Sequence, residues 1–302
     1  MMGTMTTTLT TPMTSTARVL APVTSSFGLR SLLVYVVAAY AWTWSFNLLK
    51  ILGQRGAVVL PVPDLLLDIT AGLGPLLAAL AVVSYEAGSA GRSALLRQLL
   101  RWRVPRGWYA VAVLGPVVLV LAAYGLWIAT GGAPPPAEAL AQWPLVPVFF
   151  LYILLVGGGV DEELGWRGFA LPRLQDRYGA LVASLVLGVF WAGWHIPAWF
   201  SPGSGQDLIS FPVFVVSVIG AAIVFNWLYN STGGALPLVI IFHTMFDLLT
   251  TGPWARALYT LPPGRPGLDL FTLLTAVVVV AAVGVVIMTD PRTLTRRRSP
   301  AS

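Results

Sequence analysis

Six ionisable side chains stand inside long apolar runs of this 302-residue sequence. Charged groups within a membrane span are costly and usually face a cavity, so each is a candidate functional residue. Carboxylates and imidazoles can activate water, carry protons or bind a divalent cation. The candidates are Glu162, Glu163, Arg167, His195, His243 and Asp247.

The acidic pair belongs to the run DEELGWRGFALP, residues 161–172. Glu163 and Arg167 are four residues apart with the acid first, which predicts a same-face ion pair that offsets the cost of burying the guanidinium. Glu162 points about 100° away and has no expected partner within the helix. A lone carboxylate in an apolar site suits a general base near neutral pH. The alternative is that both acids only satisfy polar groups of neighbouring helices.

The chain has two histidines, and both fall inside predicted helices. Asp247 follows His243 by four residues, so both side chains share one helix face and can hold a metal ion, or a water and a carbonyl, between them. Glu162, His195 and His243 are expected about 15, 22 and 12 Å from the cytoplasmic face. A lone membrane histidine more often bonds a neighbouring helix, but two at similar depth beside a diacid favour a site.

Composition predicts the fold class. Hydrophobic residues make up 57% of the chain and charged residues 10%, against about 25% charged in a soluble domain. The runs are apolar on every side, unlike the alternating segments of a β-barrel. We expect an all-α, polytopic membrane protein of about eight transmembrane helices with the site in its membrane-embedded core. The predicted spans are 29–52, 65–86, 108–130, 145–171, 180–200, 208–229, 235–252 and 268–288, and Pro172 is expected to end the fourth.

Basic residues predict the orientation. With both termini cytoplasmic, thirteen of the 18 Lys and Arg residues fall on the inner side and four on the outer side, and Arg167 belongs to the site. We therefore expect a multi-pass protein of the cell membrane with cytoplasmic termini. The inner residues are Arg18, Arg30, Arg92, Arg97, Arg101, Arg103, Arg106, Arg173, Arg177, Arg292, Arg296, Arg297 and Arg298, and the outer ones are Lys50, Arg55, Arg256 and Arg265.

One domain is expected, because the sequence shows no internal repeat or linker. Residues 1–28 are predicted to be a disordered cytoplasmic leader, 29–288 a single transmembrane helical domain and 289–302 a basic cytoplasmic tail. The segment 93–108 spaces Leu and Trp against Arg like a helix lying on the inner leaflet, with substrate docking as the alternative. The net charge of +6 is read as a topology signal, so the lipid bilayer is an expected partner and nucleic acid is not. The absence of cysteine excludes thiol catalysis and disulfides.

Three motifs resemble those of the CPBP family of intramembrane metalloproteases, which comprises CAAX-processing and bacteriocin-processing (Abi) enzymes. The family pattern EExxxR, FxxxH and HxxxN or HxxxD, each on its own helix, reads here as Glu162-Glu163-Leu-Gly-Trp-Arg167, Trp191-Ala-Gly-Trp-His195 and His243-Thr-Met-Phe-Asp247. The resemblance covers a core of about 145–252. Trp191 replaces the usual Phe, and Asp247 replaces the Asn of many members. An ionised Asp accepts hydrogen bonds only, so Asp247 suits metal coordination or holding the His243 tautomer.

The resemblance implies an intramembrane metallo-endopeptidase of the type II CAAX prenyl endopeptidase kind, acting on a peptide or a membrane-protein tail. Glu162 would activate water beside His195, His243 would polarise the carbonyl, and the Glu163–Arg167 pair would orient Glu162. Zn²⁺ or another divalent metal would be held by His195, His243, Glu162 and Asp247, and a metal-free glutamate mechanism is the alternative.

Two other functions fit the same residues. Buried Glu, His, Asp and Arg also mark the pathways of ion- or proton-coupled transporters, although such transporters usually carry repeats with broken helices, which this sequence lacks. A non-catalytic membrane scaffold that binds peptides or confers immunity is the second alternative. For the protease, we expect the substrate to enter from the cytoplasmic side, where the helix of the acidic pair is predicted to end.

Overall fold

The computed structural model describes residues 28–296, except 253, 255–258, 261, 263 and 265–266. The predicted leader up to residue 27, the end of the tail at 297–302, and the topology residues Arg18, Arg256, Arg265, Arg297 and Arg298 lie outside the described residues.

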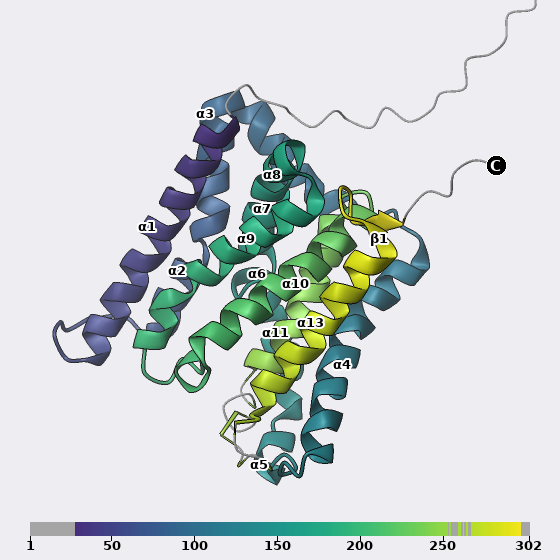
Figure 1. Ribbon diagram of the computed structural model, residues 1–302. Helices are drawn as coiled ribbons and strands as arrows, with labels where there is room; N and C mark the ends of the chain where they lie inside the picture. Colours follow the sequence, from purple (N-terminus) through teal and green to yellow (C-terminus); the bar gives the residue numbers. More distant parts are fainter. Residues whose placement is uncertain are drawn as a thin grey trace, which may run out of the picture.

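The described chain forms a bundle of helices running between two end faces (Figure 1). Seven helical stretches of this part are long and apolar enough to cross a membrane, and α11 is a shorter apolar helix of 16 residues. The prediction of an all-α polytopic membrane protein is confirmed. The α-helices are α1 (Gly28–Gln54), α2 (Asp64–Gly72), α3 (Gly74–Leu96), α4 (Arg106–Ala129), α5 (Ala137–Leu140), α6 (Val146–Val156), α7 (Val160–Gly165), α8 (Leu171–Tyr178), α9 (Ala180–Trp194), α10 (Phe211–Ser231), α11 (Leu236–Thr251) and α13 (Leu270–Met288).

The remaining elements are short. They are 3-10 turns at Arg97–Leu100, Trp143–Leu145, Ile196–Phe200 and Gln206–Leu208, a π-helical turn at Trp166–Ala170, and the antiparallel strands β1 (Thr289–Asp290) and β2 (Thr295–Arg296). The two strands form a small hairpin at the start of the predicted tail, and Leu294 within it is fully buried.

Large apolar side chains cover the outside of the bundle, as expected for a surface in contact with lipid tails. A helix satisfies its backbone N–H and C=O groups internally, which lipid requires. Examples of side chains that are more than half exposed are Leu33, Val118, Leu155, Val280 and Ile287.

Small residues let the central helices approach closely. Helix α10 packs against both α9 and α13. At Gly188 of α9, an added Cβ would lie only 2.8 Å from the Cα of Ile219 on α10. Because lipid supplies no hydrophobic force between helices, such close backbone packing is the usual source of their association.

The fourth predicted span is interrupted and does not end at Pro172. It breaks at 157–159, resumes as α7, passes through the π-helical turn and continues as α8. In the π-helical turn, the N–H of Leu171 bonds to the carbonyl of Trp166, five residues back. Pro172 is therefore the second residue of α8, and the helix continues past it to Tyr178. The acidic pair lies about 24 Å, rather than about 15 Å, from the end of its helix.

The predicted inner-leaflet helix over 93–108 is also divided. Helix continues only to Leu100, residues 101–105 are not helical, and α4 begins at Arg106. The reason is Pro105, since the residue before a proline is sterically pushed out of helical geometry.

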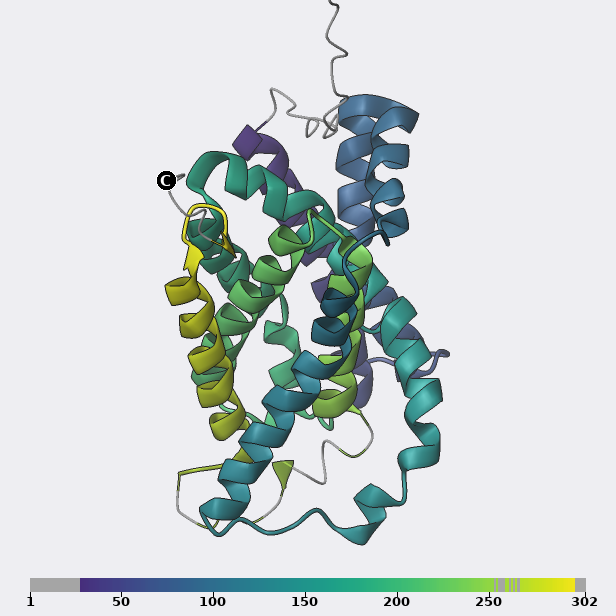
Figure 2. The ribbon, with the colours of Figure 1, turned by 90° about the vertical axis from the view of Figure 1, so that its right-hand side faces the viewer.

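Both described ends of the chain lie at the same end of the bundle (Figure 1). The backbone N–H of Ala180, at the start of α9, bonds to the carbonyl of Arg292. At the opposite end, the Ser201 hydroxyl donates to the Gln54 side chain at the end of α1. The loop 201–210 therefore lies at the end away from the termini, and Figure 2 shows the stretch 130–145 crossing that same end.

Single cysteines can test the predicted orientation, because the chain has none of its own. Ser210, in the loop away from the termini, and Arg292, in the hairpin at the described C-terminal end, are both exposed. With cytoplasmic termini, a membrane-impermeant maleimide should label Ser210→Cys in intact cells and Arg292→Cys only after permeabilisation. The reverse pattern would contradict the predicted orientation.

Candidate active site

The buried ion pair predicted within the fourth span is present. Arg167 Nη1 lies 2.7 Å from Glu163 Oε1, and both side chains are fully buried. Arg167 Nε donates to Asn226 Oδ1 at 3.2 Å, and Asn226 in turn donates to the Ser184 hydroxyl. The guanidinium carbon lies 4.5 Å from the centre of the Trp191 ring, a cation–π contact. The charge is thus compensated from three other helical segments.

Glu163 contacts His243 directly, and within the described residues no direct bond joins the Glu163–Arg167 pair to Glu162, so the orienting role of that pair stays a prediction. Glu163 Oε1 lies 2.7 Å from His243 Nδ1. On the other side of the imidazole, His243 Nε2 lies 3.3 Å from Asp247 Oδ2, which confirms that this pair shares a face of α11. Arg167, Glu163, His243 and Asp247 therefore form one continuous polar chain.

Glu162 is not without a partner in its own helix, in contrast to the prediction. Its Oε2 accepts hydrogen bonds from Trp191 Nε1 at 2.7 Å and from Trp166 Nε1 at 3.2 Å. Trp166 follows Glu162 by four residues, so an indole occupies the same-face position that sequence reasoning left empty. Neutral donors hold this carboxylate, while a cation holds Glu163.

His195 lies at the end of α9 and is fixed by its own helix. Its Nδ1 lies 2.8 Å from the carbonyl oxygen of Trp191. A carbonyl can only accept, so Nδ1 carries the hydrogen, and in the neutral ring Nε2 is an acceptor. The Trp191 ring lies 6.2 Å from the His195 ring and 5.2 Å from the His243 ring, so both imidazoles pack near one indole.

Helix α11 places His243 deep in the bundle because it starts below the end face. Ala235, Leu236 and Leu238, at its beginning, are at most 2% exposed. Gly233 and Gly234, with φ of 64° and 81°, make the turn that leads the chain inward. His243 thereby reaches the level of Glu163, although it is only two turns into its helix.

The helix break in the fourth span brings backbone against the His243–Asp247 pair. Gly158 has φ of 123°, a conformation that favours glycine. A Cβ at this position would lie 3.0 Å from Asp247 Oδ2 and 3.2 Å from His243 Nε2. The N–H of Gly158 donates to Asp161 Oδ1 at 2.9 Å, so the buried Asp161 stabilises the break.

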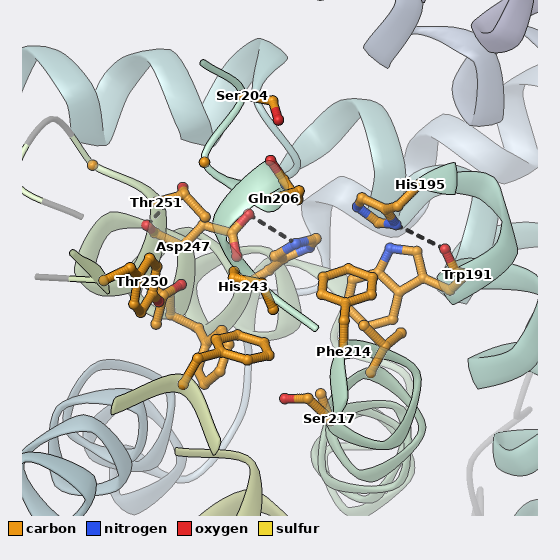
Figure 3. A pocket seen from close by; sticks show the side chains of 18 of the residues that line it. Trp191, His195, Ser204, Gln206, Phe214, Ser217, His243, Asp247, Thr250 and Thr251 are labelled. Atoms are coloured by element: carbon orange, nitrogen blue, oxygen red, sulfur yellow. Dashed lines mark hydrogen bonds and ion pairs between the residues drawn. The ribbon is translucent and has the colours of Figure 1, made fainter. Parts of the chain in front are cut away.

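A cavity of about 300 Å³ opens beside these residues (Figure 3). Trp191, His195, His243 and Asp247 line its polar part, whereas Glu162 is not among its lining residues. Aromatic side chains line much of the remainder, namely Phe214, Phe246, Tyr259 and Phe271. The cavity can accept an apolar group next to two imidazoles and a carboxylate.

The mouth of the cavity is formed by the loops at the end away from the termini. Its lining includes Gly203, Ser204, Gln206 and Gly252. A cytoplasmic entrance and cytoplasmic termini cannot both hold if this cavity is the substrate's route. The cytoplasmic entrance is predicted from the end of the fourth span. The polar side chains of the cavity instead open toward the beginning of that span.

The tentative metal set does not form a preassembled centre in this arrangement. In the described part of the chain, no three His, Asp or Glu side chains come close enough together to hold a metal ion. His243 Nδ1 faces Glu163, His195 Nδ1 faces a carbonyl, and the Glu162 oxygen nearest the indoles accepts from two donors, so the Nε2 atoms are the imidazole nitrogens that these bonds leave open. As placed, the described donors form no three-ligand group, and the mechanism below uses no metal.

Sequence reasoning missed several residues of this network. Asp161 stands in the quoted acidic run, but no role was assigned to it. Asn226 and Ser184 are polar residues inside apolar spans, so the rule that selected the charged candidates could have found them. Trp166 gave no such signal, because a tryptophan in a membrane helix looks like ordinary apolar surface.

Comparison with known proteins finds a match over the segment that carries these residues. Residues 143–249 match the family model described as Rce1-like, type II CAAX prenyl endopeptidase. Over 109 residues, the chain is 36% identical to CAAX prenyl protease 2 of Methanococcus maripaludis. The resemblance to the CAAX protease-like family is confirmed. This CAAX protease-like segment makes up 34% of the chain and covers 39% of that relative. It contains all six candidate residues, whose individual roles stay predictions.

Removing Arg167 should strongly destabilise the CAAX protease-like segment, because Glu163 would be left buried without its cation. We expect Arg167→Met to lower the free energy of unfolding by about 3–5 kcal/mol, measured by denaturant titration in detergent micelles. The matched control is Arg177→Met at an exposed position of α8, with an expected loss below about 0.5 kcal/mol. Equal losses for both variants would show that the buried ion pair contributes no more to the free energy of unfolding than an exposed arginine does.

Proposed function

We propose that this chain is an intramembrane endopeptidase. The observation that carries the proposal is the convergence of Glu162, His195 and His243 on one buried indole, Trp191, at the wall of the cavity. Peptide hydrolysis needs an activated water, a donor for the carbonyl oxygen and a proton for the leaving amine. A carboxylate and two imidazoles in one place can supply all three.

In this mechanism, Glu162 takes a proton from water, whose oxygen forms a bond to the carbonyl carbon of the substrate. The proton then passes from Glu162 to the amide nitrogen as the carbon–nitrogen bond breaks. His243, when both ring nitrogens are protonated, donates from Nδ1 to Glu163 and directs its Nε2–H toward Asp247 Oδ2. From there the Nε2–H can shift to the carbonyl oxygen of the substrate. His195 Nε2 can accept a hydrogen bond from the attacking water.

The substrate class proposed is a peptide or a membrane-protein segment with an apolar side chain near the cleaved bond. Support comes from the aromatic lining of the cavity, which includes Phe214, Phe246 and Phe271. We further propose that the substrate enters through the mouth between the segment 201–210 and the end of α11 at 250–252. With cytoplasmic termini, this mouth faces the outer side of the cell membrane.

Glu162→Gln tests the proposed base. Gln keeps the size of the side chain but cannot take a proton, so kcat should fall by about 10²- to 10⁴-fold. The assay uses purified protein in detergent with a library of quenched fluorescent peptides. Glu138→Gln, at an exposed position of α5, is the matched control and should cleave as the wild type does.

The same experiment separates the alternatives. Cleavage that survives Glu162→Gln would remove the proposed base. A wild type that cleaves nothing but carries protons into liposomes would favour the transporter, and one that binds peptide without turnover would favour the scaffold.

The donor geometry supports the metal-free form of this mechanism. We expect cleavage to persist after treatment with 1,10-phenanthroline, and the purified protein to hold less than one zinc per chain by mass spectrometry. Stoichiometric zinc that disappears in His243→Ala would instead support the metallo-endopeptidase.

A further inference from the structure

Trp191 contacts four of the six candidate residues. Its indole N–H bonds to Glu162, its ring lies under the Arg167 guanidinium, and it meets the His243 ring in a T-shaped contact. Its main-chain carbonyl accepts from His195. Figure 3 shows Trp191 and His195 side by side at one wall of the cavity, across from His243.

The hydrogen bonds that the described side chains make to Glu162 reach only one of its two carboxylate oxygens, which suits a general base. Both indoles donate to Oε2, from Trp191 on α9 and from Trp166 on the segment that carries Glu162. Within the described residues, Oε1 receives no such bond, so one oxygen is held while the other can meet water. A neutral N–H fixes the carboxylate without forming the ion pair that ties Glu163 to Arg167.

The indole also links two helices that carry different catalytic groups. Glu162 belongs to α7, whereas His195 follows directly on α9. Because Trp191 bonds to Glu162 through its side chain and to His195 through its backbone, a displacement of α9 would move both bonds together. Phenylalanine at this position would keep a ring beside Arg167 and His243 but would lose the bond to Glu162.

We propose that Trp191 is the positioning residue of this site, which holds the Glu162 carboxylate in register with the His195 imidazole. The proposal rests on the endopeptidase function proposed above. Trp191 sets the orientation of the base and takes no part in bond making or breaking.

Trp191→Phe tests this role. A hydrogen bond to a charged group contributes about 1.5–3 kcal/mol, so we expect kcat to fall by about 10- to 100-fold while KM changes less than about threefold. Trp166→Phe, which loses the longer bond, should lower kcat less, and the double variant should lower it more than either. A kcat of Trp191→Phe equal to that of the wild type would overturn the proposal.

Trp127→Phe is the matched control. Trp127 is 1% exposed, and its indole N–H donates to the carbonyl of Ala133 at 2.8 Å, outside the site. This variant loses an indole hydrogen bond of similar length, but that bond does not involve the site. It should therefore keep the wild-type kcat. An equal loss of kcat in Trp127→Phe would show that lost packing, not the bond to Glu162, explains the effect.

Nuclear magnetic resonance of the indole N–H groups gives a readout that does not depend on activity. The Trp191 and Trp166 signals, assigned by their loss in the two Phe variants, should both move in Glu162→Gln, and the Trp127 signal should not. If the wild type cleaves no peptide but the signals move, the proposed function fails and the bond to Glu162 stands. If the Trp191 signal does not move, the positioning role fails even in an active protein.

Discussion

The burial of one guanidinium in a lipid-embedded bundle is the constraint on which the rest of this structure depends. Arg167 is fully buried, and a charge at this depth is tolerated only with compensation. Glu163, Asn226 and the face of Trp191 provide it from three directions. These contacts fix the relative positions of α7, α9 and α10, and Glu163 extends them to His243 on α11. The cation thus organises the site without facing the cavity itself.

Most of the fold could be predicted from the sequence, because a bilayer allows few solutions. Apolar length gave the spans to within a few residues, and the i,i+4 spacing gave the Glu163–Arg167 and His243–Asp247 contacts. The interruptions could not be predicted in the same way. The break at 157–159 depends on Asp161 accepting from Gly158, and Pro172 is accommodated by a π-helical turn five residues long. Both are local bonding patterns that apolar length and i,i+4 spacing do not reveal.

The candidate residues could be found by type, but their pairing could not. The sequence analysis expects the Glu163–Arg167 pair to orient Glu162. In the structure, Glu163 contacts His243, eighty residues along the chain. Which carboxylate meets which imidazole is decided by helix rotation and depth, and α11 reaches the site only because its start is buried. Trp191 was noted only as an aromatic substitute for Phe and Trp166 as apolar helix, because hydropathy does not show that both indoles donate to the same carboxylate oxygen.

The four-residue spacing of Glu163 and Arg167 also bears on how the chain enters the membrane during synthesis. A charged residue at the centre of an isolated helix costs about 2.5–3.5 kcal/mol on the translocon scale. Glu163 and Arg167 leave the ribosome almost together and can enter as a neutral dipole, whereas His243 is made only after three further α-helices, α8, α9 and α10. Until then, Glu163 has its cation but not its imidazole. The nascent fourth span can therefore insert early, while the site itself is completed only once α11 has been translated.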